Sequence, residues 1–274
     1  MASVETSTAG TMTPPAHVCR AFGASGAAVP LAGGEGRAFR IGDVVVKAVH
    51  DDAESAWVQG MLAGLEPDGF RIPTPLRTTA GQWVGDGWIA SVFVPGLRPA
   101  APRWTDIIEW GLRFGKAASR QLTDGALGLA RRTHRWAVAD RVAWQEQEVD
   151  LSPEAAEVRS AIGRFLDPAP STERQVIHGD LAGNVFVDTD GCPVILDVSP
   201  YLRHPRLAAA IVIADAVLWH GADTSLSSAF AADRTDRDLL GRALIFRLVA
   251  EQLAEHPRHG ARLDPYRRVL AAIR

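Results

Sequence analysis

The sequence predicts an α+β fold, with a small antiparallel β-rich part up to about Pro95 and a mainly helical part from residue 96 to Arg274. Two observations support this division. In the first part, short runs of β-branched and aromatic residues are separated by glycines, as expected of strands and tight turns. From Thr105 onward, apolar residues instead recur at spacings of three and four, which is typical of amphipathic helices. The chain of 274 residues is long enough for two such lobes.

Composition and charge exclude several classes of protein. Apolar residues make up 47% of the chain and charged residues 22%, as in ordinary globular proteins. The net charge of -3 gives no reason to expect nucleic acid or a membrane surface as a partner, and it predicts no oligomeric state. No apolar run approaches about 18 residues and no secretory signal is visible, so we expect a cytoplasmic protein. Cys19 and Cys192 are far apart in the sequence, which favours two buried thiols over a disulfide or a zinc site.

The first lobe is expected to follow a short leader. Residues 1–16 are small, polar and rich in breakers, so we expect them to be disordered. Residues 17–95 form the lobe itself, which begins with a short helix at 18–22. Three strands are predicted between residues 29 and 47, and a helix with an apolar face is predicted at 52–65.

A glycine-rich loop and a lysine mark the three predicted strands. Glycines allow a backbone to approach phosphate oxygens closely, and the loop contains Gly33, Gly34 and Gly36. Because no Gly-Lys-Ser/Thr sequence and no helix follow, the loop is neither a P-loop nor a Rossmann motif. Lys47 ends the third strand, although arginine is the usual basic residue of this chain. In the alternative interpretation, the glycine-rich loop is a plain hairpin loop, and Lys47 is a lysine on an edge strand that prevents aggregation.

Glu54 lies at the start of the helix predicted at 52–65 and has two interpretations. It could be the acidic partner of Lys47, or it could belong to a capping box in which Asp51 is the N-cap residue. Beyond this helix, the segment 70–76 reads as an extended linker. Three short apolar runs then predict the remaining strands of the sheet, at residues 83–84, 88–90 and 92–94.

The second part is predicted to be mostly helical. Apolar periodicity and helix-start residues place its helices at residues 105–122, 127–136, 152–166, 207–219, 238–253 and 264–273. The helix at 207–219 is apolar nearly all round and should be buried. It nevertheless contains Asp215, and a buried carboxylate needs polar partners.

One stretch of this second part gathers chemically active residues at the ends of short strands. The strands are predicted at 176–177, 185–187 and 194–196, and the loops beside them carry His178, Asp180, Asn184 and Asp197. Carboxylate and amide oxygens suit Mg²⁺, which binds one or two carboxylates together with substrate phosphates. The stretch therefore predicts a metal-phosphate site. In the alternative interpretation, these residues merely form turns, as we expect of Asp188 and Asp190.

This pattern resembles a known family. His-Gly-Asp, an Asn four residues after the Asp, and a hydrophobic strand ending in Asp are similar to the catalytic core of the aminoglycoside phosphotransferase and choline kinase group. These small-molecule kinases have the protein-kinase-like two-lobed fold. Over residues 30–220, the resemblance implies that Asp180 accepts or orients the substrate hydroxyl proton, and that Asn184 and Asp197 hold Mg²⁺.

The resemblance also implies roles for residues outside this stretch. Lys47 would pair with the nucleotide phosphates and with Glu54. His178 and Asp215 would support the catalytic loop. The purine would contact backbone groups where the first lobe ends, at Ser91, Val92, Phe93 and Val94.

The implied activity is Mg²⁺-dependent transfer of the γ-phosphoryl group of ATP or GTP to a hydroxyl group of a small molecule. His-Gly-Asp and Asp-Val-Ser differ from the protein-kinase motifs, and no activation segment follows, which argues against a protein substrate. The segment 140–144 resembles one in an uncharacterised actinobacterial branch of the group. A pseudokinase that only binds nucleotide is one alternative. A metal-dependent phosphohydrolase is another, but it leaves Lys47 unexplained.

The acceptor is predicted only as a class. Residues 200–205 read as an irregular loop, and the segment 199–205 beside the site contains Tyr201, Arg203 and His204 but no acid. Polycationic aminoglycosides would call for acidic residues. The loop therefore favours a neutral or anionic metabolite, or an antibiotic-like natural product, whose phosphorylation could confer resistance.

Overall fold

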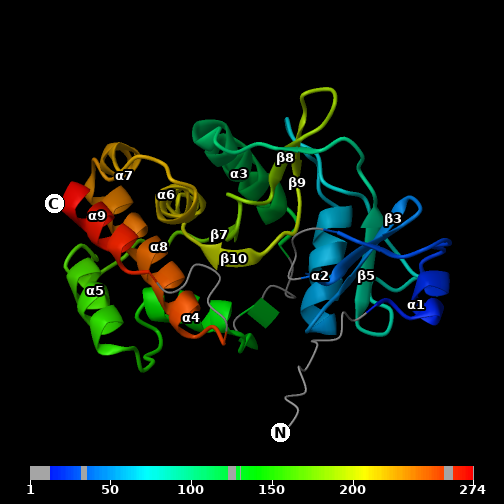
Figure 1. Cartoon of the computed structure of the whole chain (residues 1–274), viewed down its shortest axis with the longest axis horizontal. Coiled ribbons are helices and arrows are strands. Elements are labelled where there is room, and N and C mark those ends of the chain that lie inside the picture. Colours follow the sequence, from blue (N-terminus) through cyan, green and yellow to red (C-terminus); the bar gives the residue numbers. More distant parts are fainter. Residues whose placement is uncertain (1–12, 32–35, 123–127, 130, 256–261, 274) are drawn as a thin grey trace, which may run out of the picture. The chain divides into compact units, whose positions relative to one another are not determined.

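The chain divides into two compact units, which are described here one at a time (Figure 1). The computed structural model describes residues 13–31, 36–122, 128–129, 131–255 and 262–273. The N-terminal unit comprises the chain up to Ala63 together with Pro73–Pro95, and the C-terminal unit comprises Gly64–Ile72 and Gly96–Arg274. Residues 1–12 of the expected leader lie outside the described residues, and the first helix already begins at Ala16.

The N-terminal unit is an antiparallel sheet of five strands in the order β1-β2-β3-β5-β4. The strands are β1 (Val29–Pro30), β2 (Ala38–Ile41), β3 (Val44–Ala48), β4 (Pro75–Leu76) and β5 (Trp88–Val92). Burial alternates along β2, β3 and β5, as it does when one face of a sheet covers a core. The described residues of this unit also form two helices, α1 (Ala16–Ala21) and α2 (Asp52–Ala63).

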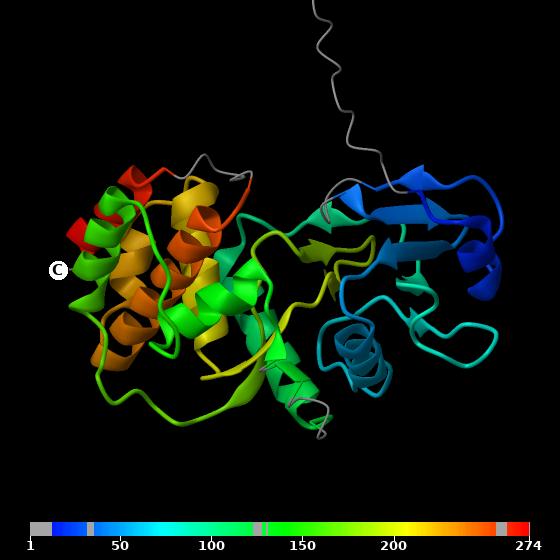
Figure 2. The same cartoon turned by 90° about the horizontal axis from the view of Figure 1, so that it is seen from below.

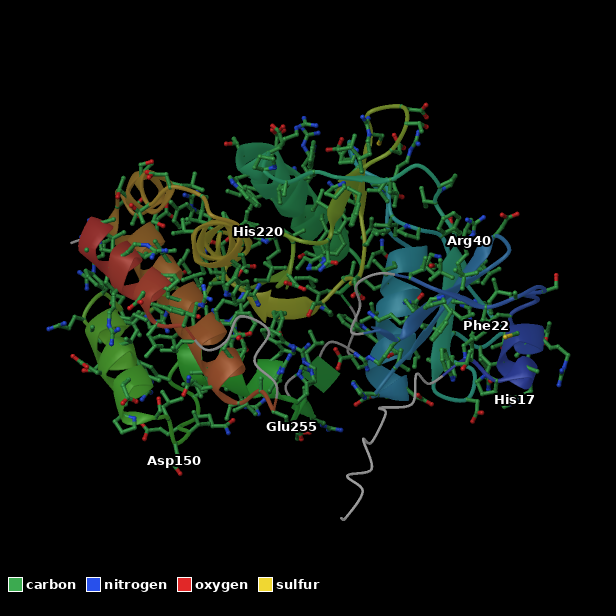
Figure 3. The ribbon with its side chains drawn as sticks, viewed as in Figure 1. His17, Phe22, Arg40, Asp150, His220 and Glu255 are labelled. Atoms are coloured by element: carbon green, nitrogen blue, oxygen red, sulfur yellow. The ribbon has the colours of Figure 1, made fainter. Side chains whose placement is uncertain are left out.

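Helix α1 belongs to the core of this unit. Val18 and Phe22 are buried against the sheet residues Phe39 and Trp88. At the surface, His17 pairs with Asp86 at 2.7 Å, and Figure 3 labels His17 on α1 and Phe22 directly after the helix.

The strands predicted around residues 83–94 were partly wrong. Only β5 forms there, and residues 83–84 lie in a turn region instead of a strand. Arg77 places its guanidinium carbon 3.7 Å from the centre of the Trp83 ring, so this indole covers a side chain at the surface. Conversely, Pro75–Leu76 was expected to be a linker but pairs with β5 as an edge strand, a position that suits proline.

The C-terminal unit contains two small sheets. The hairpin of β8 (Val185–Val187) and β9 (Pro193–Ile195) is joined by β6 (Arg98–Pro99). Separately, β7 (Gln175–His178) pairs with β10 (Pro200–Arg203). The prediction of an irregular loop at 200–205 was therefore wrong for residues 200–203, because their backbone is held by the ladder with β7.

Seven helices of the C-terminal unit are described. They are α3 (Trp104–Ser119), α4 (Arg135–Ala143), α5 (Pro153–Gly163), α6 (Leu207–Trp219), α7 (Ser225–Phe230), α8 (Arg234–Gln252) and α9 (Asp264–Ala272). Helix α6 is buried along its length, as predicted, and α8 packs against both α4 and α6 (Figure 2). No helix in the described part of the chain combines the length and apolar character needed to span a bilayer.

The helix predicted at 127–136 is displaced. The helix begins at Arg135, where the imidazole of His134 accepts a hydrogen bond from the amide of Ala137 at 3.2 Å. This contact caps the first turn, so the chain before His134 is left out of the helix.

Two contacts position the strands that carry the site. Helix α3 lies close to β7 because Gly115 has no side chain, and a Cβ there would be 2.8 Å from the carbonyl oxygen of Val176. The segment Gly64–Ile72 joins β9, since the amide of Arg71 donates to the carbonyl of Pro193 and the amide of Ile195 donates back to Arg71. These bonds explain why this segment belongs to the C-terminal unit, although the sequence placed it in the first lobe.

Candidate functional site

The predicted loop residues come together because neighbouring strands are tied to each other at their ends. The ladder between β8 and β9 pairs Val185 with Ile195. One residue further on, the amide of Leu196 donates to the carbonyl of Asn184 at 2.8 Å. Asn184 and Asp197 are therefore adjacent, and they flank the turn that follows β7.

His178 joins this turn to the strand before Asp197. Its Nδ1 accepts a hydrogen bond from the amide of Asp180 at 3.0 Å, which leaves the ring proton on Nε2, 3.1 Å from the carbonyl of Leu196. The ring is fully buried beside Phe114. Burial lowers the pKa of His178 below 6.5, although the carbonyl of Leu196 and the charges of Asp180 and Asp197 oppose that shift. The ring is thus neutral and holds both loops.

Asp180 presents a carboxylate that is held and yet accessible. About half of its side chain, 51%, is exposed. The side-chain nitrogen of Asn184 donates to the carboxylate of Asp180 at 3.0 Å and to the backbone carbonyl of Asp180 at 2.7 Å. Because these bonds use the nitrogen of Asn184, its amide oxygen is the atom suited to a cation.

The turn before Asp180 requires Gly179. A Cβ at this position would collide with the ring of Tyr201, which packs across the turn from β10. The amide of Gly179 donates to the carbonyl of Ser199 at 2.8 Å, so β10 and the turn are joined by backbone as well.

Asp215 supports the turn through an arginine that the sequence analysis missed. Arg247 of α8 binds both carboxylate oxygens of Asp215, at 2.7 and 2.6 Å. Burial raises the pKa of Asp215 to about 6, with Arg247 opposing this shift. Burial alone would lower the pKa of Arg247, but the attraction of Asp215 keeps it above its ordinary value. The same guanidinium donates to the carbonyl of Gly179 at 3.0 Å.

Asp197 projects from an unusual backbone conformation. Its φ of 50° lies in the left-handed region, which aspartate tolerates better than most residues. The residue is exposed and, like Asn184, has side-chain oxygen atoms that can bind a cation. In the described part of the chain, no group of three or more His, Cys, Asp or Glu side chains could hold a metal ion. Asn184 and Asp197 fit a cation that takes its other ligands from phosphate and water, as Mg²⁺ does.

Asp188 and Asp190 belong to the turn between β8 and β9, as expected. Asp188 is buried, and its carboxylate accepts hydrogen bonds from the amides of Asp190 and Cys192. Its other oxygen binds Arg71 at 2.5 Å. These contacts commit Asp188 to the structure of the turn. Cys19 and Cys192 are both free thiols, as the sequence predicted, but they are half-buried instead of buried.

In the N-terminal unit, Lys47 occupies the middle of the sheet. It lies in β3, between β2 and β5, and it pairs with Ala38 and Ile89. The edge-strand interpretation is therefore wrong. Gly36 has a φ of 71°, which glycine adopts readily, whereas Gly33 and Gly34 lie outside the described residues.

The same unit contains Glu54 and the predicted purine-binding segment. The carboxylate of Asp51 accepts a hydrogen bond from the amide of Glu54 at 2.9 Å, which is one half of a capping box. The pairing of Glu54 with Lys47 stays a prediction. The amides of Val92 and Phe93 donate to carbonyls of the unit, at 2.9 and 2.8 Å. Ser91 pairs within the sheet, so Val94 is the first of the four residues that lies beyond these contacts.

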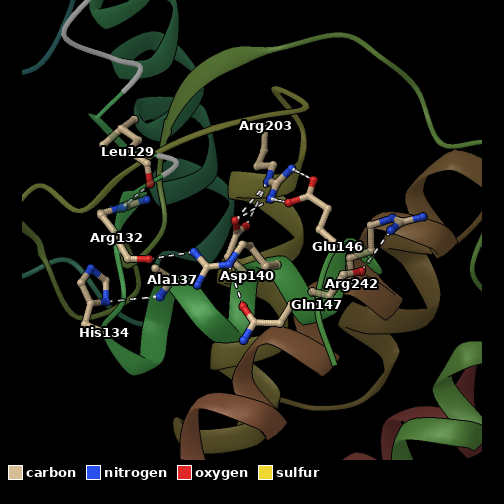
Figure 4. Close-up of polar contacts among 11 residues, drawn as sticks. Leu129, Arg132, His134, Ala137, Asp140, Glu146, Gln147, Arg203 and Arg242 are labelled. Atoms are coloured by element: carbon tan, nitrogen blue, oxygen red, sulfur yellow. Dashed lines mark hydrogen bonds and ion pairs between the residues drawn. The ribbon is translucent and has the colours of Figure 1, made fainter. Parts of the chain in front are cut away.

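The three predicted substrate residues are held inside the C-terminal unit. Tyr201 is buried, and burial raises its pKa to about 12. His204 is also buried and lies 3.5 Å from Glu173. Arg203 donates to both oxygens of Asp140 and of Glu146, with its closest contacts at 2.7 and 2.6 Å (Figure 4). Its charge is thus neutralised by acids that lie outside the segment 199–205.

The comparison with solved structures bears on the fold. No protein-family model matches the sequence, and a search of curated proteins finds no match. Among solved structures, a thermostable mutant of aminoglycoside phosphotransferase APH(4)-Ia in complex with ADP and hygromycin B has a TM-score of 0.56 and 14% identity, covering 94% of this chain and 96% of that chain.

Two further solved structures have the same architecture. An aminoglycoside phosphotransferase from Alicyclobacillus acidocaldarius has a TM-score of 0.54 and 15% identity, and 93% of each chain is covered. Choline kinase LicA from Streptococcus pneumoniae has a TM-score of 0.52 and 12% identity, covering 91% of this chain and 94% of that chain. The chain therefore has the kinase-like α+β fold of these proteins, as the sequence predicted.

Proposed function

We propose that this chain, with its kinase-like fold, is a phosphotransferase that moves the γ-phosphoryl group of ATP or GTP to a hydroxyl group of a small molecule. The observation that carries the proposal is the carboxylate of Asp180, which is half exposed and held by Asn184. A carboxylate fixed in this way can accept the proton of an incoming hydroxyl group and can orient its oxygen for in-line attack.

The other predicted residues have complementary roles in this proposal. Asn184 and Asp197 would hold Mg²⁺, which when bound neutralises charge on the nucleotide phosphates. In the N-terminal unit, Lys47 and the glycine turn at Gly36 would bind the phosphate groups, with Glu54 orienting the lysine. Among the backbone groups expected to contact the purine, Val94 is the best candidate, because the amides of Val92 and Phe93 already bind within the unit.

The acceptor is a hydroxylated small molecule, such as a metabolite or an antibiotic-like natural product. The sequence favoured a neutral or anionic acceptor because Arg203 and His204 were expected beside the site. Since Arg203 is paired with Asp140 and Glu146, it supplies no net positive charge there. The preference for an anionic acceptor loses its main support, and neutral and cationic acceptors should be screened equally.

The test starts with a thermal-shift screen of ATP and GTP with and without Mg²⁺. Mass spectrometry then searches for phosphorylated acceptors, with hygromycin B and choline among the first compounds. Asp180→Ala should lower phosphoryl transfer at least about 100-fold, the usual scale of acid–base assistance, while nucleotide affinity stays within a few-fold.

The matched control is Asp190→Ala, which removes a carboxylate that is 73% exposed in the nearby turn. This variant should transfer phosphate at the wild-type rate. Substantial transfer by Asp180→Ala to the true acceptor would disprove the role of Asp180.

A further inference from the structure

Helix α8 contains a buried arginine whose contacts reach the proposed active site. The side chain of Arg247 is only 1% exposed, and the rings of Trp136, Trp219 and Phe246 surround its guanidinium at 4.8–5.4 Å. A charge in such surroundings must be paired, and Asp215 of α6 provides the partner.

The guanidinium nitrogen that binds Oδ2 of Asp215, Nη2, also faces the turn after β7. The nitrogen Nη2 donates to the carbonyl of Gly179 at 3.0 Å and lies 3.3 Å from Oδ1 of Asp180. On the opposite side, Asn184 donates to Oδ2 of the same carboxylate at 3.0 Å. The carboxylate of Asp180 is therefore contacted at both oxygens, at Oδ2 by Asn184 and at Oδ1 by a nitrogen that also binds Asp215 and Gly179.

We infer that Arg247 is a positioning residue, which fixes the orientation of the Asp180 carboxylate toward the acceptor hydroxyl group. This inference rests on the proposed function, and it adds to the proposed site a residue that lies outside the sequence motif. Asp215 contributes by holding the guanidinium: both of its oxygens bind Arg247, so the planar group can rotate little. A rigid carboxylate matters because misplacement of a reacting group by about 1 Å can lower a rate about 100-fold.

The competing interpretation is that Arg247 only joins α6 to α8. The chain offers a matched control for this purely structural role. Arg242 lies on the same helix, is equally buried, and pairs with buried Asp238 at 2.9 Å. Its other bonds go to the carbonyls of Ala143 and Asp167, away from the turn after β7.

The experiment compares two double variants, Arg247→Met/Asp215→Leu and Arg242→Met/Asp238→Leu. Removing both partners of a buried pair avoids an unpaired buried charge, so each protein is expected to fold. Phosphate release from MgATP is measured for both, with Asp180→Ala as the lower limit. We expect kcat to fall 10- to 100-fold in the Arg247 double variant, with the KM for ATP changed less than about threefold.

A conservative variant provides a second measurement. Arg247→Lys keeps the charge but cannot bind Asp215 and Asp180 together as the planar fork does. Its kcat should lie between those of the wild type and the Arg247 double variant. If the double variant does not fold, Arg247→Lys is compared with Arg242→Lys, and the same selective loss of kcat is expected.

Equal kcat values in the Arg247 and Arg242 variants would overturn the inference. If the wild type releases no phosphate and phosphorylates no acceptor, the proposed function fails, and crystal structures of the variants decide the positioning role separately. A carboxylate of Asp180 that is displaced only in the Arg247 variant supports the inference. An unchanged carboxylate in that variant overturns it.

Discussion

His178 must remain neutral to do its work in the proposed site. Its Nδ1 accepts from the amide of Asp180, and a second proton on the ring would place two donors face to face. Burial prevents this by holding the pKa of His178 below 6.5, the value for an ordinary histidine. Protonation is thus expected to disturb the turn that carries Asp180.

This histidine makes a pH dependence predictable. Below pH 6.5 the unfolded chain takes up a proton at residue 178 more readily than the folded protein does. The stabilising contribution of the neutral ring is therefore full above pH 6.5 and is lost as the pH falls through the lower pKa of the folded state. The raised pKa of Asp215, about 6, acts in the opposite direction over this range but is common to both proteins. Between pH 7 and pH 5, the melting temperature of the wild type should therefore fall relative to that of His178→Gln. Parallel melting curves of the two proteins across this range would contradict the assignment.

Glu54 provides a second test at the residue scale. Lys47 lies in a central strand beside Ala38 and Ile89, so its charge is partly removed from water and favours a carboxylate partner. If Glu54 is this partner, Glu54→Gln should reduce turnover well beyond any effect on stability.

The control for Glu54→Gln is a variant that removes only the helix cap, in which the amide of Glu54 donates to Asp51. Asp51→Ala removes the hydrogen bond to that amide and should cost about 1 kcal/mol of stability, with turnover retained. Wild-type turnover in Glu54→Gln would show that Glu54 acts only at the start of the helix.

Strand β10 shows what an element adds to the site. It pairs with β7 from His178 back to Gln175, and it places the ring of Tyr201 against Gly179. At its end, Arg203 binds Asp140 and Glu146. Burial raises the pKa of Asp140, whereas the hydrogen bond from Arg203 lowers the pKa of Glu146. The ionised form of the buried Asp140 therefore depends on Arg203 more than that of Glu146 does.

Removing this arginine should destabilise the C-terminal unit. Arg203→Met leaves Asp140 without its main partner, which should cost about 3 kcal/mol in urea unfolding. Glu146→Gln should cost less than about 1 kcal/mol, because the side chain of Glu146 is 44% exposed. If Arg203 instead binds the acceptor, Arg203→Met would raise the KM for that acceptor while leaving stability unchanged.

Elements with a strong local signal were predictable, and those that depend on distant partners were not. Helix α6 begins and ends where the sequence predicts, because thirteen largely apolar residues permit little else. Strand β10 was missed because prolines suggested a loop and its partner lies more than twenty residues earlier. Helix α4 was misplaced because a histidine cap is a weak sequence signal.

At the scale of the whole molecule, the kinase-like fold was predictable from one local stretch, which also supplies the candidate site residues. Asp180, Asn184 and Asp197 are close in sequence, and their spacing is what resembles the phosphotransferase motif. Arg247 lies 67 residues beyond Asp180 and reads as an ordinary helix residue, so no spacing could have indicated its contact. The available signal was an arginine with apolar residues on both sides, at 243–246 and 248–250.

The whole chain should respond to its ligand by mass action. At 100 times the dissociation constant, MgATP should stabilise the folded protein by about 2.7 kcal/mol, which corresponds to several degrees in melting temperature. Asp197→Asn should lose the part of this shift that depends on Mg²⁺. Asparagine suits the test because it also tolerates the left-handed backbone at this position. Because the chain forms two units, each melting transition should be followed separately.

Asp190→Asn is the control for this measurement, and its Mg²⁺-dependent shift should equal that of the wild type. An undiminished shift in Asp197→Asn would mean that the metal ion is held elsewhere.

The bonds made by Leu196 have a practical consequence. Its amide is bound by the carbonyl of Asn184, and its own carbonyl is bound by His178. The peptide hydrogen of Leu196 can therefore exchange with deuterated water only when the two loops separate. The hydrogen-exchange rate of this amide therefore reports how often the two loops separate. It can be measured in every variant without a substrate, before an acceptor is known.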